Sequence, residues 1–266
     1  MTLTLVNEVE VAVGAARQAG DYLREKFGSV SLKDIAYKGN INIVTTFDLK
    51  AQHLILEYLK ATFPDHQFLT EEEQEQPYDS CSPCRWIIDP LDGTSNYASG
   101  FPHYCISLAL EVSGNIVLGV IYSPTLDEMF TAVRGGGAFL NDKRINVSSS
   151  SNLIDSIVAT GFPYNNGDTL QECLRMLANI TPRTRTTRAL GAAALDLCYV
   201  ACGRLDAYWD VELWPWDMSA GALIVEEAGG QVSDLSGKMF NHLGNNILAT
   251  NRVLHSEILK ILGVDE

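Results

Sequence analysis

Apolar residues follow two different spacings in the first part of this 266-residue chain. Residues 5–27, and the segment that Asp48 opens, place apolar side chains three or four positions apart, which is typical of amphipathic helices. The runs 104–112 and 116–122 alternate apolar and polar residues and are separated by a turn that contains glycine. Alternating runs joined by glycine turns predict antiparallel hairpins. The first part is therefore expected to hold two helices and a meandering sheet.

A different pattern begins after a run of serines at 148–151. From Ser156 onward, short apolar strands alternate with helical segments as far as the end of the chain. Alternation of this kind predicts a layered α/β arrangement. We therefore divide the chain into an N-terminal α+β half, 1–147, and a C-terminal α/β half, 148–266, within one compact unit.

The most informative stretch follows a short apolar strand at 86–88. Asp89 and Asp92 stand three residues apart with a proline between them, and Gly93 and Thr94 come directly behind. Because proline disfavours helical geometry in the residue before it, the strand is expected to stop at Asp89. The residues after Asp92 predict a helix entrance, where free N–H groups attract an anion. Carboxylates that bind cations would thus lie beside amides that bind phosphate.

Two other acids repeat this placement. Glu71 begins an acidic block directly after a predicted strand at 67–70, and Asp217 stands at a predicted helix start after a proline. Taken alone, Glu71 would be part of a solvated turn and Asp217 would be a helix N-cap. Together with Asp89 and Asp92 they would provide four hard oxygen ligands. Oxygen ligands without sulfur or imidazole favour Mg²⁺ or Mn²⁺ over zinc.

The formal net charge of −14 limits the partners that this chain can attract. Such a surface would repel nucleic acid and anionic membranes, so neither is expected as a partner. It would also repel a phosphate ester, unless bound cations neutralise part of the acids. No apolar run is long enough to span a bilayer, and the N-terminal residues lack the features of a signal peptide, so a cytoplasmic protein is expected.

The six cysteines do not form a metal-binding pattern. Cys81 and Cys84 make a C-x-x-C pair, but no second pair is present to complete a zinc site. A loop with two free thiols in a reducing compartment explains the pair, and a redox switch is the alternative. Cys105, Cys198 and Cys202 lie in apolar segments and are expected in the core.

Three motifs, taken in order, resemble the inositol monophosphatase family: the acids Glu71 and Glu72, the segment 86–94 and the segment 215–230. The match extends over essentially the whole chain. The resemblance implies an α-β-α-β-α sandwich of the inositol monophosphatase and fructose-1,6-bisphosphatase type, usually as a homodimer. It also implies a Mg²⁺-dependent, lithium-sensitive phosphomonoesterase that acts on inositol 1-phosphate or on a related sugar or polyol phosphate by in-line attack of water.

The same resemblance implies two metal sites and a possible third. One ion would be held by Glu71, Asp89 and the carbonyl of Leu91, and a second by Asp89, Asp92 and Asp217. A third ion would lie near Glu71, and Mn²⁺ could replace Mg²⁺. Two adjacent ions can hold both the attacking and the leaving oxygen of a phosphoryl transfer. Leu91, Asp92 and Asp217 would therefore also face the substrate.

The catalytic residues implied by the resemblance are Thr94, Asp48 and Glu71. Thr94, paired with Asp48, would orient or deprotonate the attacking water, and the amides of Gly93 and Thr94 would hold the phosphate. The remaining substrate contacts would come from small residues beside the ring of the leaving group and from an acid that binds its hydroxyls: Gly191, Ala192, Ala193 and Asp210.

Several positions differ from the family pattern, so the sequence does not identify the substrate. Thr70 replaces a glycine, Asn42 an aspartate and Asp210 a glutamate, while Lys38 and Gly39 would belong to a loop that closes over the site.

Alternatives within the enzyme class are phosphatases for histidinol phosphate, fructose 1,6-bisphosphate or a nucleotide 3′-phosphate. The alternative from another class is a protein-binding regulator that keeps the phosphatase fold.

Overall fold

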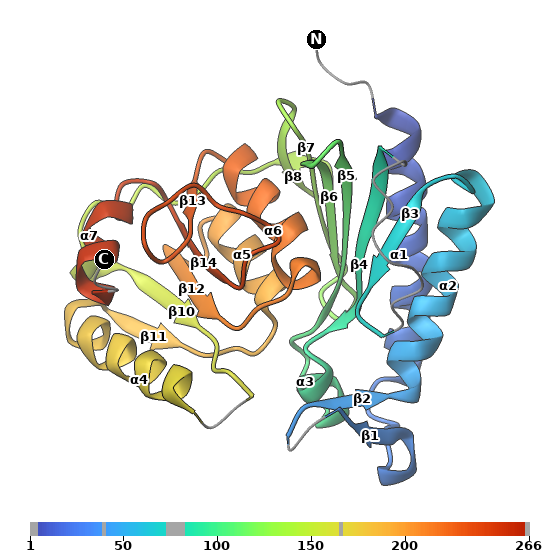
Figure 1. Cartoon of the computed structure of the whole chain (residues 1–266), viewed down its shortest axis with the longest axis horizontal. Helices are drawn as coiled ribbons and strands as arrows, with labels where there is room; N and C mark the ends of the chain where they lie inside the picture. The colour runs from blue at the N-terminus through green and yellow to red at the C-terminus, as the bar shows by residue number, and fades with distance from the viewer. Residues whose placement is uncertain (1–4, 39–40, 73–82, 165–166, 264–266) are drawn as a thin grey trace.

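The computed structural model describes residues 5–38, 41–72, 83–164 and 167–263, which form five alternating layers of helices and sheets (Figure 1). An outer pair of helices covers a seven-stranded sheet, a central pair separates it from a five-stranded sheet, and a third pair covers the far side. The predicted α-β-α-β-α sandwich is confirmed. From one outer layer to the other, the helix pairs are α1 (Val6–Lys26) and α2 (Thr46–Thr62), α5 (Ala193–Ala201) and α6 (Pro215–Glu227), and α4 (Asp168–Ile180) and α7 (His255–Leu262).

The larger sheet is built entirely from the first half of the chain, and its strands lie in sequence order. All neighbours are antiparallel except the first two strands, which are parallel. The predicted meander is therefore present. Its strands are β3 (Gln67–Thr70), β4 (Cys84–Asp92), β5 (Cys105–Val112), β6 (Asn115–Ser123), β7 (Glu128–Val133), β8 (Gly137–Leu140) and β9 (Lys143–Arg144). A two-stranded hairpin, β1 (Ile35–Tyr37) and β2 (Ile43–Thr45), and the short helix α3 (Thr94–Ala98) flank it.

The smaller sheet is mixed, and its strand order does not follow the sequence. The order is β11 (Thr186–Arg188), β10 (Ile157–Thr160), β12 (Ala207–Val211), β14 (Asn246–Thr250) and β13 (Gln231–Ser233). The first three run parallel, whereas β14 is antiparallel to both of its neighbours. The carboxyl ends of β10 and β12 therefore share one edge with the start of β14. Such edges are where α/β sheets commonly bind their ligands.

Side-chain alternation along β4 divides the core between two helix layers. Trp86 and Ile88 pack in the cluster that contains α1 and α2, whereas Ile87 packs in the cluster that contains α5 and α6. Successive side chains of a strand point to opposite faces. Asp89 therefore continues the face of Ile87 and is directed toward the central helices.

Two expectations about the ends of elements were wrong. β4 does not stop at Asp89 but continues to Asp92, with a shift of register between these two residues. Pro90 lies inside the shift, where no regular ladder bond has to be donated.

The helices that contain Asp48 and Asp217 do not begin at these residues either. Each is the third residue of its helix, and its carboxylate accepts a hydrogen bond from the capping residue's backbone, as in a capping box.

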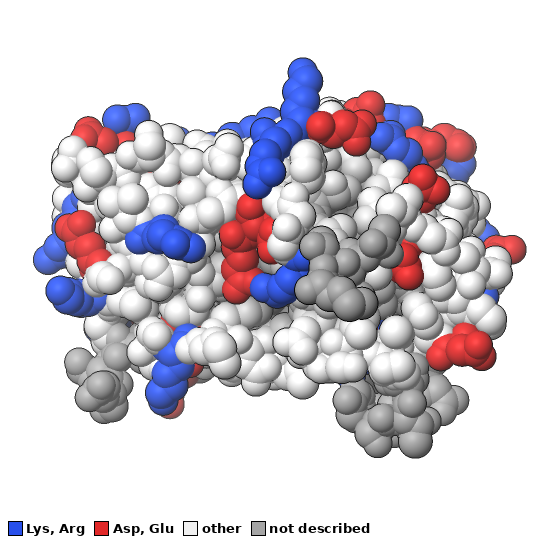
Figure 2. All heavy atoms as spheres, turned by 90° about the horizontal axis from the view of Figure 1, so that it is seen from above, with Lys and Arg blue, Asp and Glu red and all other residues white. Residues whose placement is uncertain are grey.

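The distribution of charge on the surface and the composition of the helices bear on binding to nucleic acid and membranes. On the face drawn in Figure 2, basic and acidic side chains are interspersed, and the described residues form no continuous basic patch there. Across the described residues, no helix is both long and apolar enough to cross a membrane.

Candidate active site

A cavity of about 870 Å³ lies where the two sheets and the central helices meet. This volume is at the upper end of the range typical of small-molecule sites. With the exception of Asp48, every site residue expected from the sequence lines it. Those residues are Glu71, Asp89, Leu91, Asp92, Gly93, Thr94, Gly191, Ala192, Ala193, Asp210 and Asp217.

Asp89 is the most buried acid of the cavity. Its side chain is 1% exposed, and Oδ1 accepts a hydrogen bond of 2.9 Å from the backbone N–H of Leu91. Burial raises the pKa of Asp89 well above its usual value, and the neighbouring charges of Glu71, Asp92 and Asp217 raise it further. Like charges gathered in this way favour a bound cation.

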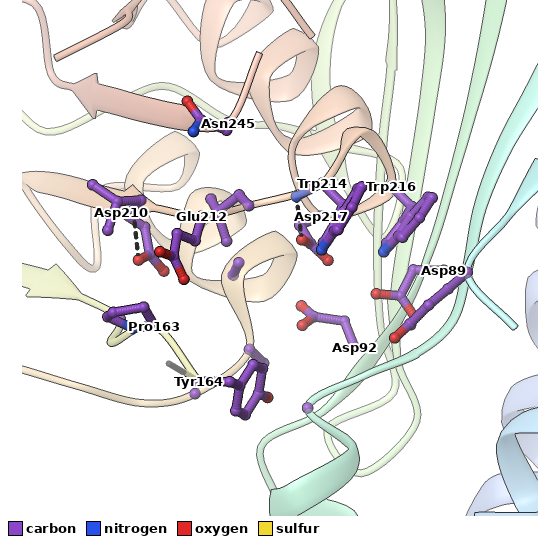
Figure 3. Close-up of a pocket in the computed structure, with 18 of the residues that line it drawn as sticks. Asp89, Asp92, Pro163, Tyr164, Asp210, Glu212, Trp214, Trp216, Asp217 and Asn245 are labelled. Atoms are coloured by element: carbon purple, nitrogen blue, oxygen red, sulfur yellow. Dashed lines mark hydrogen bonds between the residues drawn. The ribbon is translucent and has the colours of Figure 1, made fainter. Parts of the chain in front are cut away.

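Asp92 and Asp217 are held by backbone amides of the central helices. Asp92 Oδ2 accepts from the N–H of Ala194 at 2.8 Å, and Asp217 Oδ2 accepts from the N–H of Trp214 at 2.7 Å. Burial is the main reason that the pKa of Asp92 rises to about 7 and that of Asp217 rises well above its usual value. Figure 3 shows the carboxylates of Asp89, Asp92 and Asp217 turned toward the same space.

Glu71 and Glu72 share one lysine. The ammonium of Lys38 lies 2.9 Å from Glu71 Oε1 and 2.7 Å from Glu72 Oε2. Among the described residues, Glu72 Oε1 is buried without a hydrogen-bond partner. Burial raises the pKa of Glu72 to about 7, the charge of Glu71 adds to this, and Lys38 opposes it. A single ammonium therefore faces two carboxylates beside the cavity, of which Glu71 lines it and Glu72 does not.

The donor chemistry of these residues fits a hard divalent cation. The carboxylates of Glu71, Asp89, Asp92 and Asp217 line one cavity together with Leu91. Over the described residues, however, no group of three or more His, Cys, Asp or Glu side chains already has the geometry of a metal site. Mg²⁺ is commonly bound by one or two carboxylates and completed by water and substrate phosphate. The lining therefore fits a hard divalent cation that keeps water and substrate ligands, rather than an ion that requires a closed protein cage.

Gly93 and Thr94 form the turn between β4 and α3. Gly93 has φ of +90°, and a Cβ at this position would approach the carbonyl oxygen of His103 to 2.9 Å. Thr94 Oγ1 donates to Asp48 Oδ1 at 2.8 Å and also lies 3.0 Å from the carbonyl oxygen of Leu91. Asp48 is fully buried and lies behind Thr94, so it contacts the cavity lining without belonging to it.

The expected leaving-group side of the cavity is only partly polar. Asp210 is 6% exposed, and its two oxygens accept from the hydroxyl of Tyr208 at 2.6 Å and from the N–H of Val211 at 2.8 Å. Burial raises the pKa of Asp210 to about 7 against the effect of these hydrogen bonds. A Cβ on Gly161 would meet the carboxylate of Asp210, so only glycine leaves room for it.

Sequence reasoning missed one wall of the cavity. Phe162, Pro163 and Tyr164 follow β10, and Trp214 follows β12. The available signal was topological: both loops leave the carboxyl ends of parallel strands, where ligand sites are common. The sequence pattern did not reveal this edge, because it does not specify which strands are neighbours.

The remaining sequence expectations have mixed outcomes. Asn42 lines the cavity, and Thr70 is buried at the end of β3. Cys105 and Cys198 are buried as expected, whereas Cys202 is only partly buried. Both Gly39 of the predicted closing loop and Cys81 of the C-x-x-C pair lie outside the described residues.

Comparison with known proteins places this geometry in a family. The model of the inositol monophosphatase family matches residues 5–263. The chain belongs to this family. Membership supports phosphatase activity and, since the family is generally metal-dependent, a requirement for metal.

Individual members are similar over nearly the whole chain. Inositol monophosphatase 2 of Solanum lycopersicum is 41% identical over 263 residues, which cover 97% of this chain and 98% of that protein. The Nus factor SuhB of Haemophilus influenzae is 39% identical over 254 residues, or 95% of each chain. The crystal structure of the extragenic suppressor protein suhB from Bartonella henselae has a TM-score of 0.93 and 41% identity, covering 98% of this chain and 100% of that one. Family members thus carry both enzyme and regulatory names.

Proposed function

We propose that this protein is a Mg²⁺-dependent phosphomonoesterase that hydrolyses inositol 1-phosphate or a related sugar or polyol phosphate. The observation that carries the proposal is that Glu71, Asp89, Asp92 and Asp217 line one cavity together with the Gly93–Thr94 turn. Bound cations would neutralise these acids, and a phosphate could then bind beside them. Membership of a phosphatase family supports the same conclusion.

In the proposed reaction, each group of the chain has a separate task. Bound Mg²⁺ ions would supply positive charge to the phosphate and would acidify a water molecule. Because Thr94 donates its hydroxyl proton to Asp48, its oxygen keeps lone pairs that can accept a hydrogen bond from that water and aim it. The backbone amides of Gly93 and Thr94 would bind phosphate oxygens at the entrance of α3.

Phosphate release from a panel of monoesters and bisphosphates tests this proposal. We expect turnover with Mg²⁺, little turnover with a chelator, and inhibition by Li⁺. Asp89→Asn and Asp217→Asn should each lower turnover by roughly a hundredfold or more, because each removes charge from the site. Asp21→Asn, which affects only an exposed pair with Arg24, is the matched control. Full activity in both site variants would show that the metal assignment is wrong.

A regulatory role is the second candidate, and the similarity to proteins named Nus factor SuhB favours it. The two roles can be separated with the Asp89→Asn variant in cells that lack the natural gene. Rescue by this inactive variant would support regulation, whereas rescue by the active chain alone would support the enzyme. The homodimer also stays a prediction, which light scattering of the purified protein can check.

A further inference from the structure

One loop of the smaller sheet contacts the larger sheet and also forms part of the cavity wall. The loop comprises residues 234–245, between β13 and β14, and its last part, 243–245, lines the cavity. Figure 3 shows Asn245 on the side of Asp210, away from Asp89. Residues 243–245 therefore lie on the expected leaving-group side of the cavity, and we call them the leaving-group wall.

His242 connects this loop to the larger sheet by a hydrogen bond. Its side chain is 12% exposed, whereas the neighbouring residues Asn241 and Leu243 are exposed, so His242 is turned inward from an exposed stretch. The ring nitrogen Nε2 lies 3.2 Å from Glu111 Oε2 in β5. Within the part of the chain that the structure describes, no other residue of 234–245 has a hydrogen bond to the larger sheet.

Glu111 is a fixed anchor for this bond. It is 4% exposed and lies opposite Arg85 in the register of β4 and β5. The guanidinium of Arg85 donates to the same oxygen, with Nε at 3.1 Å. Ile87 and Ala109, two residues further along these strands, belong to the core cluster of the central helices. Because alternate side chains of a strand share one face, His242 meets the larger sheet on its side toward those helices.

The chemistry of the pair fixes which group donates. A carboxylate paired with a guanidinium only accepts, so Nε2 of His242 carries the proton. Burial lowers the pKa of His242 below its usual value, the charge of Glu111 opposes this, and the charge of Arg85 adds to it. At neutral pH the uncharged ring therefore donates its one N–H to Glu111.

Backbone hydrogen bonds connect this anchor to the cavity. His242 is the second residue of a turn in which the N–H of Gly244 donates to the carbonyl oxygen of Asn241 at 2.8 Å. The carbonyl oxygen of Asn245 then accepts from the N–H of Leu213 at 3.0 Å, and Leu213 also lines the cavity. The anchored turn therefore supports both the leaving-group wall and the segment that follows β12.

We propose that His242 is a positioning residue that holds the leaving-group wall in place through Glu111. Without this bond the loop would have no hydrogen bond to the larger sheet, and the wall would be free to move away from the bound alcohol. The phosphate side, at Gly93 and Thr94, would be unaffected. His242 lies behind the lining rather than in it. The inference rests on the proposed phosphatase function and adds a residue that acts on substrate affinity through the wall.

Hydrogen exchange of the free protein tests the anchor without any turnover. His242→Leu keeps a side chain of comparable size but removes the N–H donor. The amides of Leu213 and Gly244 should then exchange roughly tenfold faster, which is the size expected for the loss of one hydrogen bond to a charged group. Amides in α1 and α2 should be unchanged. His242→Gln keeps an N–H donor and should restore most of the protection.

Two results of the exchange experiment would overturn the proposal. Unchanged exchange of both amides in His242→Leu would show that the bond does not hold the wall. Equal acceleration throughout the chain would show a loss of global stability rather than of a local anchor.

Steady-state kinetics tests the consequence for the substrate. With inositol 1-phosphate, or with whichever sugar or polyol ester is turned over, His242→Leu should raise KM by roughly fivefold and change kcat by less than about twofold. Inorganic phosphate, which has no leaving group, should inhibit both proteins with the same constant. His53→Leu, which removes only an exposed histidine near Glu57, is the matched control and should change neither value.

The kinetic result can contradict the positioning role in two ways. An unchanged KM would mean that the wall does not contact the leaving group, and an equal rise in KM and in the inhibition constant of phosphate would mean a general disturbance of the site. If no ester is hydrolysed in the presence of Mg²⁺, the phosphatase assignment fails separately. Hydrogen exchange then still decides whether His242 holds the wall.

Discussion

Gly93 shows how one residue shapes the turn that is proposed to bind phosphate. Its φ of +90° is strained for any residue with a Cβ, and an added Cβ would also approach the carbonyl oxygen of His103 to 2.9 Å. Gly93→Ala should therefore displace the amides of Gly93 and Thr94. We expect kcat/KM for phosphate release to fall by roughly ten- to a hundredfold, since small displacements of a binding group have effects of this size.

Gly100→Ala separates this effect from backbone strain. Gly100 also has a positive φ of +74°, but a Cβ there would meet no atom within 4 Å. Both variants should lose about 1 kcal/mol of unfolding free energy from the unfavourable backbone conformation. Only Gly93→Ala should lose activity, and parallel losses of activity in the two variants would mean that crowding at His103 has no role.

Individual residues also show which parts of the site can be predicted from the sequence. Asp89 and Asp217 were expected in one site because their motifs carry carboxylates in a distinctive local setting. Trp214 directly precedes the recognised segment 215–230 but was not expected to line the cavity. Its place there accompanies its exposure and its stacking on Trp216, and neither property is encoded in the spacing of residues.

At the scale of elements, Asn96 connects two segments that are far apart in the sequence. From α3 its amide nitrogen lies within 2.8 Å of the carbonyl oxygens of His103 and Leu190, and 3.2 Å from that of Gly191. It therefore ties the turn that is proposed to bind phosphate to the segment that is expected to contact the leaving group. A side chain that donates to several carbonyls fixes the spacing between their segments.

Asn96→Ala should loosen this connection. The unpaired carbonyls should reduce the unfolding free energy by about 1–2 kcal/mol, and kcat/KM should fall by roughly tenfold. Asn96→Asp should be more harmful, because it directs a carboxylate at three carbonyl oxygens. Urea unfolding and phosphate release measure the two effects. Asn115→Ala, which removes only an exposed hydrogen bond to Ser113, should change neither quantity appreciably.

Helices and strands could be predicted from the sequence where their hydrophobic periodicity extends over many residues. The expected segments 5–27, 104–112 and 116–122 agree closely with α1, β5 and β6. β13 was missed because three residues are too few to show alternation. The continuation of β4 through Pro90 was missed because local proline rules do not include the register shift that accommodates it.

At the scale of the whole molecule, the site depends on both sheets. Glu71 follows β3, and Asp89 and Asp92 lie in β4 of the larger sheet. Asp210 lies in β12 of the smaller sheet, and Asp217 lies in α6 of the central helix layer. The motifs indicated that these acids belong together, but only the packing of α6 on the larger sheet explains how they meet. The boundary near residue 147 stays a proposal about folding units, since the cavity takes residues from both sides of it.

Stability in acid is a property of the whole molecule, and His255 makes it testable. This residue begins α7, is 2% exposed, and lies 3.0 Å from the hydroxyl oxygens of both Thr250 and Ser233. Burial lowers its pKa from the usual 6.5 to about 4. Between these values the unfolded chain binds a proton that the folded chain does not, so the unfolding free energy should fall as pH falls.

For His255 alone, moving from pH 7.5 to pH 5 should remove about 2 kcal/mol of stability. Buried acids such as Asp210 act in the opposite direction, because their raised pKa lets the folded chain bind protons first. Comparison with His255→Gln cancels those common contributions. Urea unfolding at both pH values should therefore show wild type losing about 2 kcal/mol more than the variant on acidification. An equal pH dependence in the two proteins would mean that His255 is already protonated, or solvated, in the folded state.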